Sequence, residues 1–378
     1  MGSERMQLSV ALTVDQLWQR APGGATTYVR ELARALAARD DVTLSGLTAA
    51  RHLSRRAVEL PASIPLVRSA DARSGRHAPS RNLWRRSTTG ESRTAPDVLH
   101  ATTWAIPPRT APLVVTIHDL AVLREPEPEG SPGDFALLRA LDTVRDEADV
   151  VVVPSAATAA DCIEHGIEPA RIHVIPHGVR VPVVARAETL HFIESRGLDR
   201  PYVMWCGTFE ARKNVVALLD AYLLLLDEHP DLDLVLVGPV GWGGAPDEVA
   251  RRMANLPPGR VHLLGRLDET DLHRAYAGAR VFCFPSTLEG FGLPVLESLA
   301  HGVPVVTATG TAMAEIADPS AVLLVDPHVP EELAAALGAA ATARHAELTA
   351  GAKALAARFT WERSAEQHMA AYRAALTG

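Results

Sequence analysis

Two carboxylates eight positions apart could hold a hydroxyl-rich ligand. Glu289 and Glu297 flank a Gly-Phe-Gly turn within residues 286–306, which read STLEGFGLPVLESLAHGVPVV. Ionised carboxylates accept hydrogen bonds and donate none, so they suit ligands with many hydroxyl groups. We expect Glu289 in a loop and Glu297 about one turn into a helix that opens near residues 292–294. Free N–H groups at that opening favour phosphate or sugar oxygens, although a capped helix with a buried Glu explains the pair equally well.

Two adjacent cations follow a predicted strand in the second half of the chain. Residues 202–206 are apolar and run into GTFEARKN, in which Arg212 and Lys213 precede a predicted helix. An Arg can bind a diphosphate through two N–H groups, and a Lys binds it as a point charge. Ligands of parallel sheets bind at the carboxyl ends of the strands, so the pair favours a phosphate site over a solvated surface pair.

The first half of the chain offers two candidates at predicted strand ends. Gly23 and Gly24 follow the strand 8–14 and begin a helix, which would present backbone amides to a ligand. A helix start that needs flexible residues is the alternative, and the loop is not GxGxxG, so it gives a dinucleotide cofactor little support. His118 and Asp119 end another apolar strand, where the imidazole would point into a cleft beside or oriented by Asp119. A histidine capped by its neighbour's carboxylate is the alternative interpretation.

Short apolar strands alternate with amphipathic helices through both halves, which predicts α/β domains with parallel sheets. The 378 residues, 47% of them hydrophobic, are too many for one ordinary core and indicate two domains. A formal net charge of −8 with 22% charged residues argues against a general nucleic-acid binder. Strands are predicted at residues 8–14, 42–47, 98–100, 113–117, 150–153, 172–175, 202–206, 234–237, 261–264, 281–284, 303–306 and 321–325.

Cysteines, membrane spans and metal motifs add little. Cys162, Cys206 and Cys283 lie far apart in apolar contexts and are expected to be reduced core thiols of a cytosolic protein. No signal peptide is expected and no apolar run approaches 18 residues, so no membrane span is predicted. The triplet at 231–233 is interpreted as surface and not as a metal site. The Ala- and Arg-rich composition suggests a high-GC bacterial source.

Residues 51–96 form a locally basic stretch in an acidic protein. They hold ten arginines against three acidic residues, with Ser, Pro and Gly scattered among them. Such a run is usually a solvated loop. The alternative is an acceptor-side surface that meets an anionic lipid, a phosphate or a membrane face.

Together these motifs resemble the retaining glycosyltransferases of family 4, which have the GT-B fold. The matching pieces occur in the family's order along nearly the whole chain: Gly23-Gly24, His118-Asp119, IHVIPHGV, GTFEARKN, EGFGLPVLE and GVPVVTA. GTFEARKN with His-Asp-Leu upstream is most similar to a branch with many bacterial mannosyltransferases. The resemblance implies two Rossmann-like β/α/β domains that face a central cleft. Residues 1–180 would bind the acceptor and 181–358 the nucleotide sugar, and the helix 359–378 would cross back onto the N-terminal domain.

The resemblance also implies residue roles. Arg212 and Lys213 would neutralise the donor diphosphate, and Gly23 and Gly24 would approach the phosphate or the acceptor through backbone amides. The sugar's hydroxyls would be held by Glu289 and the backbone of Phe291, Gly292 and Leu293. His118 would face the sugar near its reacting carbon, so the catalytic set is His118, Asp119 and Glu289. Glu297 would bind the ribose, and the nucleobase would lie near Arg266, Leu267, Asp268 and Glu269, where Asp268 or Glu269 could accept from guanine.

The implied reaction is hexose transfer with retention, without a cofactor and without a metal. Arg, Lys and a helix N-terminus would offset the leaving diphosphate, which would itself act as the base for same-face attack. GDP-mannose is expected ahead of UDP- or ADP-linked sugars. Nucleotide-sugar 2-epimerases share the architecture and form the main alternative. A nicotinamide dehydrogenase ranks last because GxGxxG is absent. A catalytically silent member of the family is a further alternative.

The acceptor is left open by the sequence. A glycan, a lipid-linked sugar, a phosphoinositide and a natural-product aglycone are all compatible, whereas nucleic acid is not expected as a partner. The expected location is cytoplasmic, with peripheral contact at the inner face of the membrane through residues 51–96.

Overall fold

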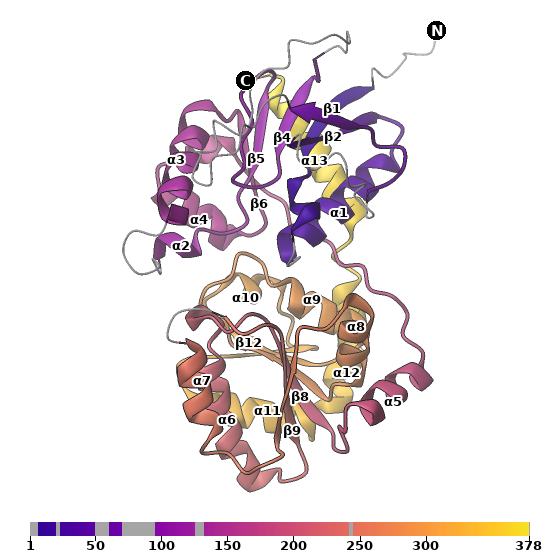
Figure 1. The fold of residues 1–378 in the computed structure, drawn as a ribbon, viewed down its shortest axis with the longest axis vertical. Coiled ribbons are helices and arrows are strands. Elements are labelled where there is room, and N and C mark those ends of the chain that lie inside the picture. The colour runs from indigo at the N-terminus through magenta and orange to yellow at the C-terminus, as the bar shows by residue number, and fades with distance from the viewer. Residues whose placement is uncertain are drawn as a thin grey trace. The chain divides into compact units, whose positions relative to one another are not determined.

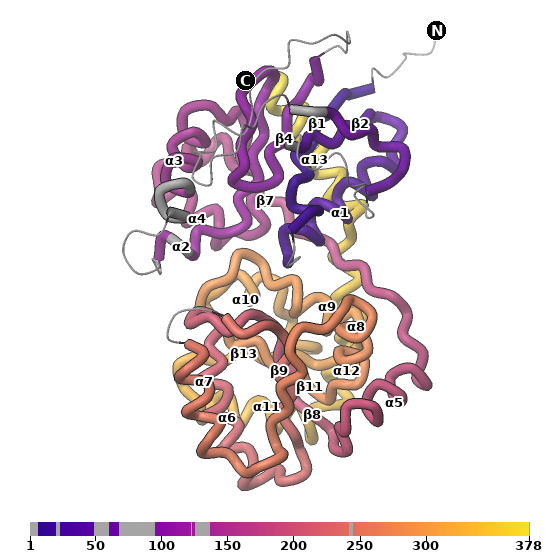
Figure 2. The backbone as a smooth tube through the Cα atoms, viewed as in Figure 1, coloured from indigo at the N-terminus to yellow at the C-terminus, as the bar shows by residue number. Residues whose placement is uncertain are grey.

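The computed structural model describes residues 7–19, 23–49, 60–69, 95–124, 132–241 and 245–377 (Figure 1). The chain divides into two compact units. Unit 1 comprises Met1–Gly178 together with Trp361–Gly378, and unit 2 comprises Val179–Thr360. The last helix, α13 (Trp361–Ala375), therefore belongs to unit 1, as the yellow tube in Figure 2 shows.

Unit 1 is built on a seven-stranded parallel sheet in the order β3-β2-β1-β4-β5-β6-β7. Its strands are β1 (Leu8–Thr13), β2 (Val42–Ala49), β3 (Leu66–Ser69), β4 (Val98–Ala101), β5 (Leu113–Thr116), β6 (Val150–Val153) and β7 (Ile172–Val174). Its other helical elements are η1 (Asp15–Trp18), α1 (Gly24–Ala37), α2 (Ala121–Arg124), α3 (Pro132–Glu147), α4 (Ala156–Glu164) and η4 (Pro169–Arg171). Figure 1 shows α13 beside α1, with α3 and α4 on the other side of the sheet.

Unit 2 is built on a six-stranded parallel sheet in the order β10-β9-β8-β11-β12-β13. Its strands are β8 (Tyr202–Cys206), β9 (Asp233–Val237), β10 (Val261–Gly265), β11 (Val281–Phe284), β12 (Val305–Ala308) and β13 (Val322–Val325). Its helical elements are α5 (Arg186–Ser195), η5 (Ala211–Lys213), α6 (Val215–Glu228), α7 (Ala245–Met253), α8 (Glu269–Gly278), α9 (Leu293–His301), α10 (Ala312–Ile316), α11 (Pro330–Ala341) and α12 (His345–Ala356). The two sheets confirm the predicted α/β class with parallel strands.

The strand order reverses at β1 in unit 1 and at β8 in unit 2. β1 lies between β2 and β4, and β8 lies between β9 and β11. The central strands β4, β5, β6 and β11 are buried along their whole length, which explains their continuous apolar sequences. In open parallel sheets a ligand binds outside the carboxyl ends of the strands at such a reversal. A ligand site is therefore expected in the loops that follow β1, β8 and the strands next to them.

Every predicted strand is present, with small shifts and one omission. The strand predicted at 303–306 begins later, at Val305, because the Val303 N–H bonds to Ser298 O and Pro304 has no N–H to pair. The strand β3 was not predicted, because its four residues lie inside the polar stretch 51–96. Residues 51–59 and 70–94 of that stretch lie outside the described residues.

The prediction of a surface turn at residues 231–233 is wrong for Asp233. This residue begins β9 and is only 2% exposed. Its carboxylate accepts hydrogen bonds from Arg260 Nε at 2.8 Å and from His262 Nε2 at 2.9 Å. Because the buried charge is matched by a guanidinium, Asp233 fixes the start of β9 to β10 and is part of the fold.

Candidate functional site

The loops that follow β8 and β11 are tied together at the reversal point of the unit 2 sheet. Ser286 Oγ and Thr287 N both donate to Arg212 O, at 2.9 and 2.8 Å. Asn214 follows η5 with a left-handed φ of +53°, a conformation that Asn tolerates better than most residues. Its Nδ2 donates to Pro327 O at 2.7 Å, which anchors the start of α6. The backbone at the cation pair is therefore held on both sides.

Three predicted site residues meet in this place through one carboxylate oxygen. Glu289 Oε2 forms an ion pair with Lys213 Nζ and lies 3.4 Å from Arg212 Nη1. Arg212 Nη2 binds Glu210 Oε2 at 2.9 Å. Lys213 is only 8% exposed, and its ammonium lies 5.0 Å from the centre of the Phe284 ring. The arrangement holds two cations at a sheet edge with little water around them, which strengthens their interaction with any charged group.

Glu289 is ionised in this setting. Burial by itself would raise its pKa, but the charges of Lys213 and then Arg212 outweigh burial and hold the pKa of Glu289 below its usual range. Ser286 Oγ lies 3.4 Å from the same oxygen. The carboxylate is thus a fixed acceptor for hydrogen bonds near the cations.

The helix α9 opens beside this cluster, as the sequence predicts. Gly292 precedes it with φ +96°, and a Cβ at that position would lie 2.7 Å from Met313 Cγ, so glycine is required there. Pro294 occupies the first turn, where a missing N–H costs nothing. Phe291 and Leu293 are 6% and 8% exposed, so they offer backbone atoms more than side chains to a ligand.

Glu297 lies one turn further along α9 and is half-buried. Its charge acts on two groups, the half-buried Cys206 at the end of β8 and the buried Tyr276 on α8. Burial, supplemented by Glu297, raises the pKa of the Cys206 thiol to about 12. Burial raises the pKa of Tyr276 as well, with smaller contributions from Cys206 and Glu297. Both neighbours are therefore neutral at pH 7.

The predicted nucleobase residues lie after β10, two strands away from β8 in the sheet. Arg266, Asp268 and Glu269 are exposed, and Leu267 is half-buried. Asp268 caps α8, because its Oδ1 accepts the Asp271 N–H at 2.8 Å. One of its oxygens is thus committed to the helix.

In unit 1, His118 follows β5 and is held by its neighbours. Its Nε2 donates to Thr102 O at 3.0 Å, and the ring of Tyr28 meets it edge-on with 4.9 Å between centres. Burial lowers the pKa of His118, while the Thr102 bond and the Asp119 charge offset part of that effect. The imidazole is therefore neutral at pH 7, with its proton on Nε2 and an accepting lone pair on Nδ1. Asp119 Oδ1 accepts the Ala121 N–H at 3.1 Å and so begins α2.

The two predicted glycines begin α1. Both are exposed, and Gly23 has an extended φ of −135°, which any residue adopts. A Cβ at Gly23 would meet nothing within 4 Å. Among the described residues that point is open space, so a ligand could reach the backbone amides at the start of α1.

A buried hydrogen-bond network in unit 1 was not predicted from the sequence. It joins five residues from α1, two strands and the last helix: Tyr28, His100, Thr116, His368 and Tyr372. The first and last elements are far apart in the chain, with 340 positions between Tyr28 and His368. Only an unexplained His at position 368 on the apolar face of a helix could have pointed to it.

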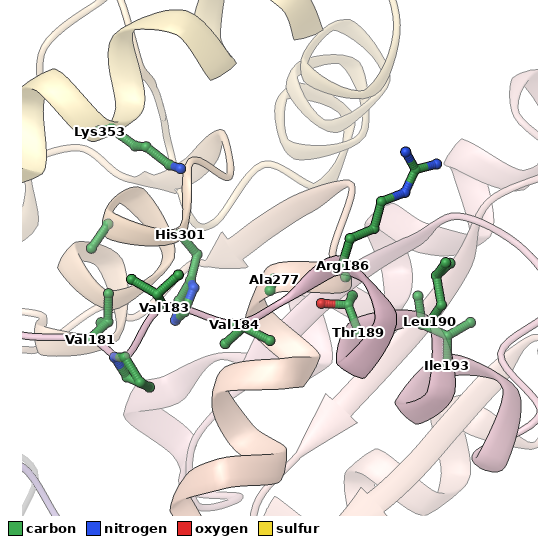
Figure 3. Close-up of a pocket in the computed structure, with 13 residues that line it drawn as sticks. Val181, Val183, Val184, Arg186, Thr189, Leu190, Ile193, Ala277, His301 and Lys353 are labelled. Atoms are coloured by element: carbon green, nitrogen blue, oxygen red, sulfur yellow. The ribbon is translucent and has the colours of Figure 1, made fainter.

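Unit 2 also contains a cavity of about 680 Å³ away from the predicted site (Figure 3). Figure 3 shows His301 and Lys353 on one side of it and Arg186 on the other. Burial, together with the charges of His273 and Lys353, lowers the pKa of His301 to about 4. The cavity lies at the C-terminal ends of α8 and α9, and none of the predicted site residues lines it.

Membrane-spanning helices and metal-binding clusters are absent from the described residues. No helix in those residues is long and apolar enough to cross a membrane. No group of three or more His, Cys, Asp or Glu side chains in the same residues could hold a metal ion.

Comparisons with known proteins cover most of the chain. The profile of the family described as Glycosyltransferase Family 4 matches residues 22–183, and that of Glycosyl transferases group 1 matches residues 200–342. The chain is 30% identical over 290 residues to the O-antigen chain mannosyltransferase B of Escherichia coli, which covers 73% of this chain and 74% of that relative. It is 32% identical over 292 residues to the D-inositol 3-phosphate glycosyltransferase of Acidothermus cellulolyticus, covering 70% of this chain and 62% of that relative.

A solved structure shares the fold. The crystal structure of Anabaena HepE in complex with UDP and glucose aligns with a TM-score of 0.73 at 19% sequence identity. The alignment covers 96% of this chain and 99% of that protein.

Proposed function

This chain belongs to glycosyltransferase family 4 and is a glycosyltransferase of the GT-B fold, and on that premise we propose that it is a retaining, metal-independent hexosyltransferase. It would move a hexose, mannose in the first place, from a nucleotide-diphosphate sugar to a hydroxyl group. The acceptor would be a glycan, a lipid-linked sugar or a natural product. Unit 1 would bind this acceptor and unit 2 the nucleotide sugar.

The observation that carries the proposal is the cluster of Arg212, Lys213 and Glu289 at the reversal point of the unit 2 sheet. A leaving diphosphate gains negative charge as the sugar departs, and two held cations stabilise that charge in the transition state. No metal is needed for this step if the cations and the N-terminus of α9 supply enough positive potential. Glu289 would accept hydrogen bonds from the sugar's hydroxyls and Glu297 from the ribose hydroxyls.

The unit 1 residues have complementary roles in the proposal. Neutral His118 offers Nδ1 as an acceptor to a hydroxyl of the donor sugar near its reacting carbon. Asp119 offsets part of the lowering of the His118 pKa by burial, and it begins α2. Gly23 and Gly24 would bring the open N-terminus of α1 to a phosphate or to the acceptor.

GDP is the favoured nucleotide, with UDP next. The Escherichia coli relative is named a mannosyltransferase, which favours a mannose donor, whereas the Anabaena structure holds UDP and glucose. Guanine could be bound by Glu269, or by the Asp268 oxygen that does not cap α8. Arg266 and Leu267 would complete that subsite.

The acceptor in this proposal is anionic or membrane-associated. The Acidothermus relative is named for inositol 3-phosphate, and residues 51–96 carry ten arginines. The protein would act in the cytoplasm, at the inner face of the membrane when the acceptor is lipid-linked. Liposomes of anionic lipid, compared with neutral ones, test this part.

The first experiment is calorimetric titration with GDP, UDP and ADP in the presence of EDTA. Tight binding of one nucleotide supports the donor class and the metal-independent site together. The matching nucleotide sugar is then incubated with candidate acceptors, and NMR of the anomeric proton decides between retention and inversion. Conversion of the donor into its 2-epimer without transfer would replace the proposal by the epimerase alternative.

A further inference from the structure

One oxygen atom of Glu289 holds both cations that a donor diphosphate would use. Lys213 Nζ and Arg212 Nη1 both point to Oε2, and Ser286 Oγ reaches the same atom. The side chains of Lys213 and Glu289 are 10% and 15% exposed, so water screens this contact poorly. In the described structure the Lys213 ammonium is already neutralised from within the protein.

A phosphate that enters this place meets a carboxylate of the same sign. It must either displace Glu289 from Lys213 or share the two cations with it, and both routes weaken diphosphate binding. An intact nucleotide sugar brings hydroxyl groups as well, and these can donate to Glu289. A free nucleoside diphosphate has no such groups near its terminal phosphate.

We propose that Glu289 is an internal competitor of the diphosphate. In the absence of ligand Glu289 occupies the cations that the diphosphate would bind, and it favours binding of the intact sugar donor over the free nucleoside diphosphate. The inference rests on the proposed function and concerns the regulation of the same site. As the diphosphate product leaves, Glu289 takes back Lys213 and Arg212. The residue that binds the sugar therefore also promotes product release.

The test compares wild type with Glu289→Gln, which removes the charge and keeps the shape. Binding of GDP, UDP, GDP-mannose and UDP-glucose is measured by calorimetry without acceptor, and the nucleotide is checked for hydrolysis. We expect Glu289→Gln to bind the preferred free diphosphate about tenfold more tightly, the effect of removing one like charge from a poorly screened site. The ratio of donor affinity to free diphosphate affinity should fall in the same variant.

Two matched variants locate the effect. Glu210 has the same 15% side-chain exposure and binds the other terminal nitrogen of Arg212, so Glu210→Gln should give a smaller gain. In a Lys213→Gln background, Glu289→Gln should lose most of its gain, because the contested cation is gone. Thermal unfolding of each variant confirms that it is folded.

The outcomes separate this inference from the proposed function. Measurable but equal diphosphate affinity in wild type and Glu289→Gln overturns the competition and leaves the glycosyltransferase site standing. Weaker binding by Glu289→Gln also overturns it, since Glu289 would then assist the diphosphate by ordering Lys213. If neither protein binds any of the nucleotides or nucleotide sugars, the proposed donor site fails and the inference fails with it.

Discussion

Both units bury polar side chains at or near the carboxyl edge of their sheets. Those around His118 in unit 1 are neutral, whereas the cluster around Lys213 in unit 2 is charged. In unit 1 the buried groups around His118 are imidazoles and hydroxyls, and burial lowers the pKa values of His100, His177 and His368. In unit 2 the buried groups at this edge include ions, with Lys213 paired to Glu289. A neutral network satisfies itself, whereas an ionic cluster can exchange one charged partner for another.

The position of each proton in the unit 1 network follows from which atoms can donate a hydrogen bond and which can only accept one. His368 Nδ1 lies 2.7 Å from Ser364 O, and a carbonyl can only accept, so Nδ1 carries the proton. The neutral ring then accepts at Nε2, and the Tyr28 hydroxyl, at 2.8 Å, is the donor. The last helix is therefore bonded to α1 in one defined direction.

The remaining bonds continue that order across the sheet. The Tyr28 oxygen accepts from Thr116 Oγ1 at 2.8 Å, and Thr116 in turn accepts from His100 Nε2 at 2.8 Å. His100 Nδ1 is then an acceptor for the Tyr372 hydroxyl at 2.9 Å. Because each proton has one place, the network stabilises the docking of α13 and has no cation to offer a ligand. Binding a diphosphate is left to unit 2.

The largest expected effect comes from breaking the ionic cluster. Lys213→Ala removes the more buried cation and leaves Glu289 with Arg212 alone, so it should lower diphosphate affinity and kcat/KM by about a hundredfold or more. Calorimetry and steady-state kinetics measure the two losses. The chain has one other lysine, Lys353, which lines the cavity away from the site, and Lys353→Ala should retain wild-type values. Equal losses in the two variants would remove Lys213 from the donor site.

Breaking the neutral network should affect stability and leave nucleotide binding intact. Tyr28→Phe removes the hydroxyl that bonds His368 and Thr116, so a buried acceptor on His368 and a buried donor on Thr116 lose their partner. We expect this to lower the free energy of unfolding by about 1–3 kcal/mol. Urea unfolding at pH 7.5 measures it, and titration with the preferred nucleotide serves as the control. An unchanged unfolding free energy would mean that the network contributes nothing net.

Acid should separate the two clusters. Imidazoles of the unfolded chain take up protons below about pH 6.5, while His368 in the folded unit stays neutral down to about pH 4. The unfolded state binds more protons in that window, so stability is full above pH 6.5 and falls as the pH drops, by about 1.4 kcal/mol per pH unit for each such proton. Glu289, with its lowered pKa, stays ionised over most of this range.

The measurement is the free energy of unfolding between pH 7.5 and 4.5, next to nucleotide affinity above the onset of unfolding. His368→Gln should show a shallower slope, by about one proton, because one depressed imidazole is gone. A slope equal to that of wild type would assign the acid sensitivity to other groups.

The sequence indicated the ionic cluster far better than the neutral one. Arg212, Lys213 and Glu289 lie in loops that follow apolar strands, and in a parallel sheet such loops gather at one edge whatever the rest of the chain does. The bond between Tyr28 and His368 depends on how α13 docks, which no local pattern encodes. The role of Asp233 was missed for the same reason, since its partners Arg260 and His262 come from the start of the next strand and the residue before it.

The smallest stability effect should come from the open helix start in unit 1. Gly23→Ala meets empty space in an extended backbone, so we expect the free energy of unfolding to change by less than about 0.5 kcal/mol. At the start of α9 in unit 2, Gly292→Ala forces a methyl against Met313 in a left-handed conformation and should cost about 1–3 kcal/mol. If the amides of α1 contact a phosphate or the acceptor, Gly23→Ala should nevertheless raise a KM severalfold. An unchanged KM for donor and acceptor would remove Gly23 from the site, and a Gly292→Ala protein as stable as wild type would show that the start of α9 is less constrained than its contacts indicate.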